Sequence, residues 1–232
     1  MMAFDSVLSV GNPMNNSLKI RHEAAWRDIR YLLHFTPIEN LTGIVTNGFL
    51  SRADLKERGL DAYGSPHRLD REDRAISVSI SAVYPKMFKA KQQAAGHPRW
   101  VILLLDASIL WTHRCRFLRR NGGKRAVLNH TGYLGGPWGF SQMFSGEDRP
   151  SGIPDRLTTY PDAEVQVFDP ISAEMILEAW VDRPELADAV QAELNRLPGM
   201  ERNVIRCSSW PVFRNGYREW IMPMPSREWK AT

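Results

Sequence analysis

The sequence has few cysteines and no long apolar segment. Its 232 residues contain two cysteines, Cys115 and Cys207, whose separation matches neither a metal-ligand pair nor a redox pair. We therefore expect a reduced intracellular protein rather than a disulfide scaffold. No stretch is long and apolar enough to cross a membrane, and the N-terminus lacks the basic-then-apolar layout of a signal peptide. These absences predict a cytoplasmic protein with no membrane partner.

The sequence also lacks the motifs of several large enzyme classes. It contains no Walker loop, no GxGxxG, no HExxH and no CxxC, which argues against nucleotide hydrolases, Rossmann dehydrogenases and the common zinc enzymes. We expect no metal site. No internal repeat or low-complexity segment occurs, and the length suits one sizeable core. The expected organisation is a single domain over residues 1–232, with a loose N-terminal segment at 1–18.

Apolar patterns predict a set of short strands. Residues 75–81 alternate, with Ile76, Val78 and Ile80 on one face and three serines on the other. The serine face either leaves room for a ligand against the sheet or faces solvent at a sheet edge. Further strands are predicted at 31–35, 101–106, 116–118, 163–168, 204–206 and 212–213.

Helices are predicted between these strands. The predicted helices lie at 20–29, 37–47, 172–179 and 184–197, and a short one near 140–144 interrupts a loop region at 121–161. Strands mixed with helices, without a regular βαβ alternation, favour an α+β domain built on a mostly antiparallel or split sheet.

The run at residues 33–40 joins a predicted strand end to a predicted helix start. Thr36 stands at the expected N-cap, with Pro37 at the first helical position and Glu39 three residues after the threonine, which predicts a capping box. Gly48 suits the left-handed end of this helix. A polar strand end beside a helix N-terminus is suited to hold a phosphorylated ligand.

Positive charge is concentrated in one segment. The formal net charge is only +4, but six cations gather in residues 114–125: Arg114, Arg116, Arg119, Arg120, Lys124 and Arg125. This cluster is either a solvated loop or a patch that follows nucleic-acid phosphates. Several of the eight tryptophans stand beside Arg or Lys. They either stack on bases or fill the core.

The remaining polar candidates form a set that suits a dinucleotide. They are His34 with Thr36, the arginines Arg52, Arg68, Arg71 and Arg74, and Glu164 on the polar face of its strand. An arginine neutralises a pyrophosphate, a histidine bonds a ribose hydroxyl, and a carboxylate stabilises positive charge on a sugar carbon. Taken alone, a histidine at a strand end is more often structural, and a glutamate on a strand face usually faces solvent.

The order of these blocks resembles the DarT-type ADP-ribosyltransferase toxins over roughly residues 30–170. The run from His34 to Arg52 is similar to that family's opening motif, in which His-x-Thr leads into a helix. The block at 68–70 before the serine strand is similar to the guanine-modifying branch. The strand at 162–167 resembles the one that bears the family's catalytic glutamate.

The resemblance implies an ADP-ribosyltransferase-like split sheet and NAD⁺ as substrate. It implies transfer of ADP-ribose to a base of single-stranded DNA, with guanine favoured, and an antitoxin partner with ADP-ribosyl-hydrolase activity. Glu164 and Arg68 would be catalytic, and His34, Thr36, Asn40 and Arg71 would bind the cofactor. Arg71 and Arg74 stay alternatives for the catalytic arginine. RNA, thymine or protein acceptors, and a non-catalytic nucleic-acid-binding protein, stay open.

Overall fold

One mixed β-sheet organises the computed structural model, which describes residues 13–60, 72–96, 99–124, 127 and 134–206. The seven strands lie in the order β4-β5-β2-β1-β3-β6-β7. Their bounds are β1 (Tyr31–Pro37), β2 (Ile76–Ile80), β3 (Trp100–Asp106), β4 (Cys115–Leu118), β5 (Glu164–Val167), β6 (Ile176–Val181) and β7 (Asn203–Arg206). Neighbouring strands run antiparallel except β6 and β7, which are parallel. The predicted α+β class is confirmed.

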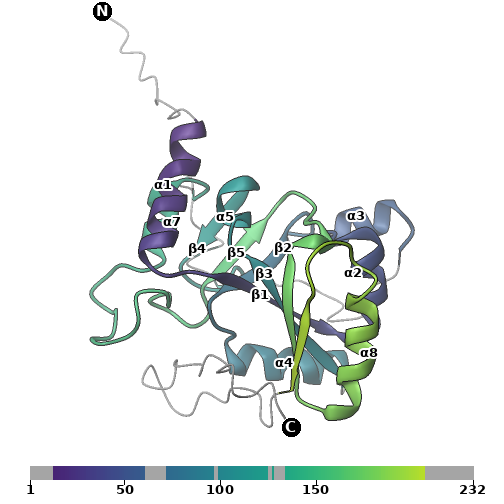
Figure 1. Ribbon diagram of the computed structural model, residues 1–232. Helices are drawn as coiled ribbons and strands as arrows, with labels where there is room; N and C mark the ends of the chain where they lie inside the picture. The colour runs from purple at the N-terminus through teal and green to yellow at the C-terminus, as the bar shows by residue number, and fades with distance from the viewer. Residues whose placement is uncertain (1–12, 61–71, 97–98, 125–126, 128–133, 207–232) are drawn as a thin grey trace, which may run out of the picture.

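Helices flank this sheet in separate groups. Their bounds are α1 (Pro13–Trp26), α2 (Leu41–Asn47), α3 (Arg52–Glu57), α4 (Pro85–Ala95), α5 (Ile109–Thr112), α7 (Pro137–Gln142) and α8 (Pro184–Leu194), with 3₁₀ turns η1 (Ile38–Asn40) and η2 (Ala173–Met175). Helices α1, α5 and α7 pack together at the upper left of Figure 1, whereas α2 and α8 pack together at the right. Helix α4 lies along the lower edge in the same view.

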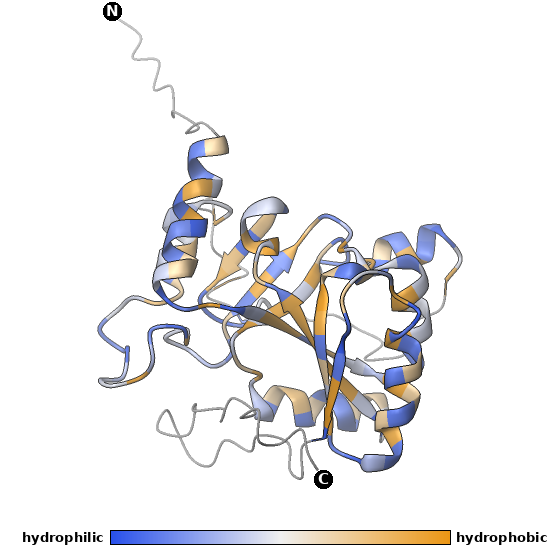
Figure 2. Cartoon of the chain, viewed as in Figure 1, coloured by the Kyte–Doolittle hydropathy of each residue, from blue (hydrophilic) through white to orange (hydrophobic). Residues whose placement is uncertain are grey.

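The core lies on both faces of the sheet because β3 is apolar on both sides. Leu103 and Leu105 pack into the larger cluster, and Ile102 packs into a smaller one with the buried Trp100 and Trp180. A continuous apolar strand between two neighbours is typical of burial on both faces. Figure 2 shows the central strands in hydrophobic colours and the helices striped with hydrophilic positions. Two of the tryptophans therefore fill the core.

The sheet splits between β1 and β2. Strand β1 pairs with β3 along its whole length, from Tyr31 to Pro37. With β2 it pairs only at Leu32↔Ile80 and Leu33↔Ser79. Beyond Leu33 no register pair joins the two strands, so their polar ends border a common space.

Some sequence-based predictions about secondary structure are wrong. The helix predicted at 172–179 is the turn η2 followed by strand β6, because β6 finds ladder partners in both β3 and β7. Pairing with neighbours overrides local helix propensity in such a segment. From Pro13 onward, the N-terminal segment predicted to be loose forms the start of α1. The strand predicted at 212–213 lies outside the described residues.

The capping box predicted at Thr36 does not form. Pairing with β3 continues to the end of β1, so Thr36 lies opposite Val101 within the sheet. Its hydroxyl accepts a hydrogen bond from Asn40 Nδ2 at 2.8 Å rather than from a helix amide. The Glu39 carboxylate bonds Arg99 instead, at 2.5 Å. The chain therefore passes from β1 through η1 into α2 without a side-chain cap.

The close approach of the Ile171 carbonyl to Gly48, at the end of α2, can be tested by substitution. Gly48 has a φ of 77°, and a Cβ placed there would lie 2.6 Å from the Ile171 carbonyl oxygen. We expect Gly48→Ala to lower the free energy of unfolding by more than Gly59→Ala. Gly59 also has a positive φ, of +64°, but a Cβ there has no atom within 4 Å. Gly48 combines its positive φ with a ψ of −175°, a region that is essentially restricted to glycine.

Gly59→Ala should therefore cost only the conformational strain, about 1 kcal/mol. Denaturant melts of both variants measure the difference. Equal losses in the two variants would show that the approach of Ile171 does not constrain this turn.

Candidate active site

A cavity of about 910 Å³ opens where β1 and β2 diverge. Its walls come from the ends of β1 and β2, from α2, α3 and α4, and from the segment after β4. The described site candidates that line it are His34, Thr36, Asn40, Arg52 and Glu164. The fold thus brings together residues that lie far apart in the sequence, such as His34 and Glu164.

Glu164 is the first residue of β5 and is 6% exposed. Its Oε1 accepts a hydrogen bond from Ser77 Oγ at 2.5 Å. Its Oε2 accepts from Asn121 Nδ2 at 3.0 Å and from the Gly122 amide at 3.1 Å. The glutamate therefore faces the cavity rather than solvent, and three neutral donors orient its carboxylate.

His34 lies across the split from Glu164, on β1. Its Nδ1 is 3.1 Å from the Ser77 carbonyl oxygen. Because a carbonyl only accepts, we assign the proton to Nδ1, which leaves Nε2 as an acceptor in the neutral ring. Burial lowers the pKa of His34, and the hydrogen bond to Ser77 opposes this effect in part. The imidazole is therefore neutral at neutral pH and packs edge-on against Phe49.

Ser77 connects the two candidate residues. Its main-chain carbonyl accepts from His34, and its hydroxyl donates to Glu164. This serine lies on the hydroxyl face of β2, so of the two interpretations of that face, the structure favours the one with room for a ligand. Ser77 of β2 therefore fixes the His34 imidazole and the Glu164 carboxylate close to each other.

Thr36 and Asn40 form a polar pair on the β1 side of the cavity. Thr36 is 5% exposed, and its hydroxyl accepts from the Asn40 amide. Both side chains line the cavity near the end of β1. Thr36 is buried and Asn40 is half-buried, and an internally bonded pair of this kind presents fixed polar atoms to a ligand.

The predicted arginines are only partly within the described residues. Arg68 and Arg71 lie outside them. Arg74 is described: its side chain is 74% exposed, lies 3.6 Å from Glu57 and does not line the cavity. Arg52, the first residue of α3, does line it.

The basic cluster at 114–125 is divided by the fold. Its described members all have partners: Arg114 pairs with Asp169, Arg116 with Gln166 and Glu72, Arg119 with the Ser145 carbonyl, and both Arg120 and Lys124 with Asp162. Of these cations only Lys124 lines the cavity. Among the described members of the cluster, Arg120 and Lys124 share Asp162 and flank the two residues that contact Glu164.

Helix α4 is a wall of the cavity that the sequence analysis missed. Tyr84, Met87 and Lys91 from this region line the cavity. The signal was present, because Pro85 stands at the first helical position and Gly96 follows the last one with a φ of +63°.

The structure also bears on metal binding, on the state of the Cys115 thiol and on membrane-spanning helices. Within the part of the chain that the structure describes, no group of three or more His, Cys, Asp or Glu residues could hold a metal ion. Cys115 is buried and free, and burial raises its pKa to about 12. No helix among the described residues is long and apolar enough to cross a membrane.

The site therefore combines a split mixed sheet with a buried glutamate and a neutral histidine at the split. The model of one protein family, described as "DarT: ssDNA thymidine ADP-ribosyltransferase, DarT", matches residues 33–211. Since this match covers most of the chain, the protein belongs to the DarT family of single-stranded-DNA ADP-ribosyltransferases.

Some solved structures have a similar fold. Thermus sp. 2.9 DarT in complex with carba-NAD⁺ has a TM-score of 0.53 and 18% identity, over 77% of this chain and 96% of that one. The same protein in complex with ADP-ribosylated ssDNA has a TM-score of 0.51 and 18% identity, over 78% and 95%. The fold expected from the resemblance is confirmed.

A third structure is more distant. Thermosipho africanus DarTG in complex with ADP-ribose has a TM-score of 0.49 and 14% identity, over 76% of this chain, and this chain spans 50% of that one. A search of curated proteins gave no match.

The half-buried His34 predicts a pH dependence of stability. Because the pKa of His34 is lowered in the folded state from 6.5, the unfolded chain binds a proton below that pH that the folded chain does not. The free energy of unfolding should therefore fall as the pH drops below about 6.5, by at most about 1.4 kcal/mol per pH unit from this group. His34→Asn keeps an amide donor for the Ser77 carbonyl and should flatten the profile.

Denaturant melts between pH 5 and pH 8, roughly the range in which histidine titrates, measure this difference. His22→Asn, on the exposed face of α1, controls for the loss of an imidazole elsewhere. An unchanged profile in His34→Asn would contradict the burial argument.

Proposed function

We propose that this protein transfers ADP-ribose from NAD⁺ to a base of single-stranded DNA and releases nicotinamide. The observation that carries the proposal is the Glu164 carboxylate, which three donors hold inside a cavity that extends to His34. The cavity volume of about 910 Å³ lies within the usual range for a site that encloses a ligand of this size. Family membership and the NAD⁺-bound and carba-NAD⁺-bound structures of Thermus sp. 2.9 DarT support it.

The β1 side of the cavity is the proposed position of NAD⁺. His34 offers Nε2 as an acceptor for a ribose hydroxyl or an amide, and Thr36 with Asn40 offers a fixed polar pair beside it. Arg71 completes the proposed cofactor set, and Arg68 is the proposed catalytic arginine near the phosphate and the acceptor base. The roles of these two arginines come from the family resemblance.

The proposed reaction exchanges one bond of the ribose for another. The bond between nicotinamide nitrogen and ribose C1′ breaks, and positive charge develops on the sugar. Glu164 accepts a hydrogen bond from the 2′-hydroxyl and stabilises that charge, as carboxylates do in glycosyl transfer. The acceptor base attacks C1′ and loses its proton to solvent. Because the carboxylate is only 6% exposed, its field is weakly screened.

The identity of the base that accepts ADP-ribose is a separate part of the proposal. The sequence resemblance favours guanine, whereas the description of the family names thymidine. Either base must leave the stack to reach Glu164, which favours single-stranded DNA over a duplex. We propose guanine, with thymine and RNA as the alternatives. The proposed cellular partner is an antitoxin whose ADP-ribosyl-hydrolase activity reverses the modification.

Substitution of the glutamate tests the chemistry. In Glu164→Gln the amide oxygen can still accept from Asn121 and Gly122, and the Ser77 hydroxyl can rotate to accept from the new amide. The fold should therefore survive while the negative charge is lost. We expect transfer to fall about 100-fold or more, measured as nicotinamide release with single-stranded DNA present.

A thermal melt of Glu164→Gln controls for its folding. A folded variant with wild-type nicotinamide release would rule out Glu164 as the charge-stabilising group. A wild-type protein that binds DNA but releases no nicotinamide would instead favour a non-catalytic nucleic-acid-binding protein.

Oligonucleotides of single base composition test the acceptor. The protein is incubated with NAD⁺ and DNA strands that each contain one type of base, and the products are weighed by mass spectrometry. We expect the mass of one ADP-ribosyl group to be added to strands that contain guanine. An adduct confined to thymine strands would overturn the guanine assignment, and adducts on RNA but not DNA would overturn the choice of nucleic acid.

A further inference from the structure

Two cations share one buried carboxylate beside the cavity. The Asp162 side chain is 6% exposed; its Oδ1 lies 2.9 Å from Arg120 Nε, and its Oδ2 lies 3.0 Å from Lys124 Nζ. One negative charge therefore meets two positive ones, and the group carries a net charge of about +1 at neutral pH. The side chains of Arg120 and Lys124 remain 36% and 47% exposed, so a ligand can reach them.

The Arg120 guanidinium is already held in place. It lies 4.3 Å from the centroid of the Tyr160 ring, and the Tyr160 hydroxyl donates a hydrogen bond to Asp148. Stacking on the ring and pairing with Asp162 restrict the guanidinium from two sides. A group that is ordered before binding loses less conformational entropy when an anion binds.

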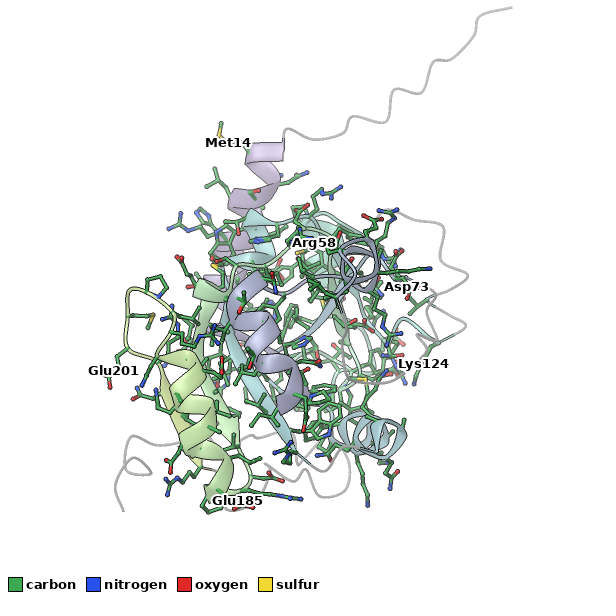
Figure 3. The ribbon with its side chains drawn as sticks, turned by 90° about the vertical axis from the view of Figure 1, so that its right-hand side faces the viewer. Met14, Arg58, Asp73, Lys124, Glu185 and Glu201 are labelled. Atoms are coloured by element: carbon green, nitrogen blue, oxygen red, sulfur yellow. The ribbon has the colours of Figure 1, made fainter. Side chains whose placement is uncertain are left out.

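The cation pair lies directly next to the candidate catalytic carboxylate. Asn121 and Gly122, which hold Glu164 Oε2, stand between Arg120 and Lys124 in the chain. Lys124 and Asp162 line the same cavity as Glu164. Figure 3 shows Lys124 at the right-hand edge of the molecule, on the same side as Asp73 and away from Glu201. An anion bound here would lie at the outer edge of the cavity.

The sheet places this pair away from the proposed NAD⁺ wall. Arg120 and Lys124 follow β4, whereas His34 and Thr36 lie on β1, and both β5 and β2 stand between β4 and β1. Glu164, on β5, therefore lies between the two groups. A phosphate at Arg120 and Lys124 would therefore lie next to the carboxylate, beside the segment that follows β4.

We propose that Arg120 and Lys124, bridged by Asp162, bind a backbone phosphate of the acceptor strand next to the base that enters the cavity. The inference rests on the proposed function and names the residues that hold its second substrate. A guanidinium and an ammonium fixed side by side offer several charge-assisted donors to phosphate oxygens. Such contacts position the strand without reading its sequence. They do not determine which base is modified.

The affinity for single-stranded DNA tests this site without any need for catalysis. The full-length wild-type protein, Lys124→Gln, Lys124→Arg and the control Lys19→Gln are titrated with a labelled oligonucleotide at several salt concentrations, without NAD⁺. Lys19 is exposed on α1, at the far end of β1 from the cavity. Asp162 keeps Arg120 as a partner in Lys124→Gln, and a thermal melt verifies the fold of each variant.

We expect Lys124→Gln to bind DNA more weakly and to lower the slope of log Kd against log salt by about 0.7, the value for one lost contact to a single strand. Lys124→Arg should restore both quantities, and Lys19→Gln should match the wild type. If Lys124→Gln matches Lys19→Gln, the site does not bind DNA phosphate.

A second measurement separates the two sources of phosphate. A raised KM for NAD⁺ in Lys124→Gln, with unchanged DNA affinity, would assign the cations to the NAD⁺ pyrophosphate and overturn the proposal. A Lys124-dependent DNA affinity in a wild-type protein that releases no nicotinamide would support the phosphate site and contradict the proposed transferase activity instead.

Discussion

The candidate site depends on the place where β1 separates from β2. Up to Leu33 the two strands share a ladder, and beyond it β1 stays with β3 alone. Ser77 spans the gap that results, because its carbonyl accepts from His34 on one side and its hydroxyl donates to Glu164 on the other. The separation makes room for a ligand, and the serine keeps the two strand edges in a fixed relation. Without Ser77, His34 and Glu164 would each lose a hydrogen bond that fixes its side chain relative to β2.

Two buried carboxylates at or just before the start of β5, Asp162 and Glu164, have different kinds of partner. Among the described residues, Glu164 accepts hydrogen bonds from a hydroxyl, a side-chain amide and a main-chain amide, which orient its carboxylate. Asp162 instead faces two cations. Both are buried, and burial of a carboxylate requires such compensation. The contacts of Asp162 hold the loop at 120–124, and that loop supplies two of the donors that orient Glu164. The loop at 120–124 therefore links the proposed acceptor site to the proposed catalytic group.

Sequence patterns predicted the single strands of this fold better than they predicted which residues meet in the cavity. Period-2 alternation located β2 and β5, and the apolar run located β3, because these patterns depend on local burial alone. The helix predicted at 172–179 was wrong because the second half of this segment pairs with β3 and β7, and local spacing does not reveal such partners. Thr36 was assigned to a cap for the same reason, whereas a capping box does form at Ser51. That Ser77, Asn121 and Glu164 meet follows from the strand order β4-β5-β2-β1, which no local pattern encodes.

The central claim is that Glu164 and His34 act on one NAD⁺ molecule in the cavity at the split. A crystal structure of the full-length protein with carba-NAD⁺, an analogue that resists cleavage of the nicotinamide bond, tests it directly. The account predicts the 2′-hydroxyl of the nicotinamide ribose within hydrogen-bonding distance of the Glu164 carboxylate, with His34 on the same side of the ligand. An analogue bound elsewhere, or bound in the cavity with its ribose away from Glu164, would contradict the account.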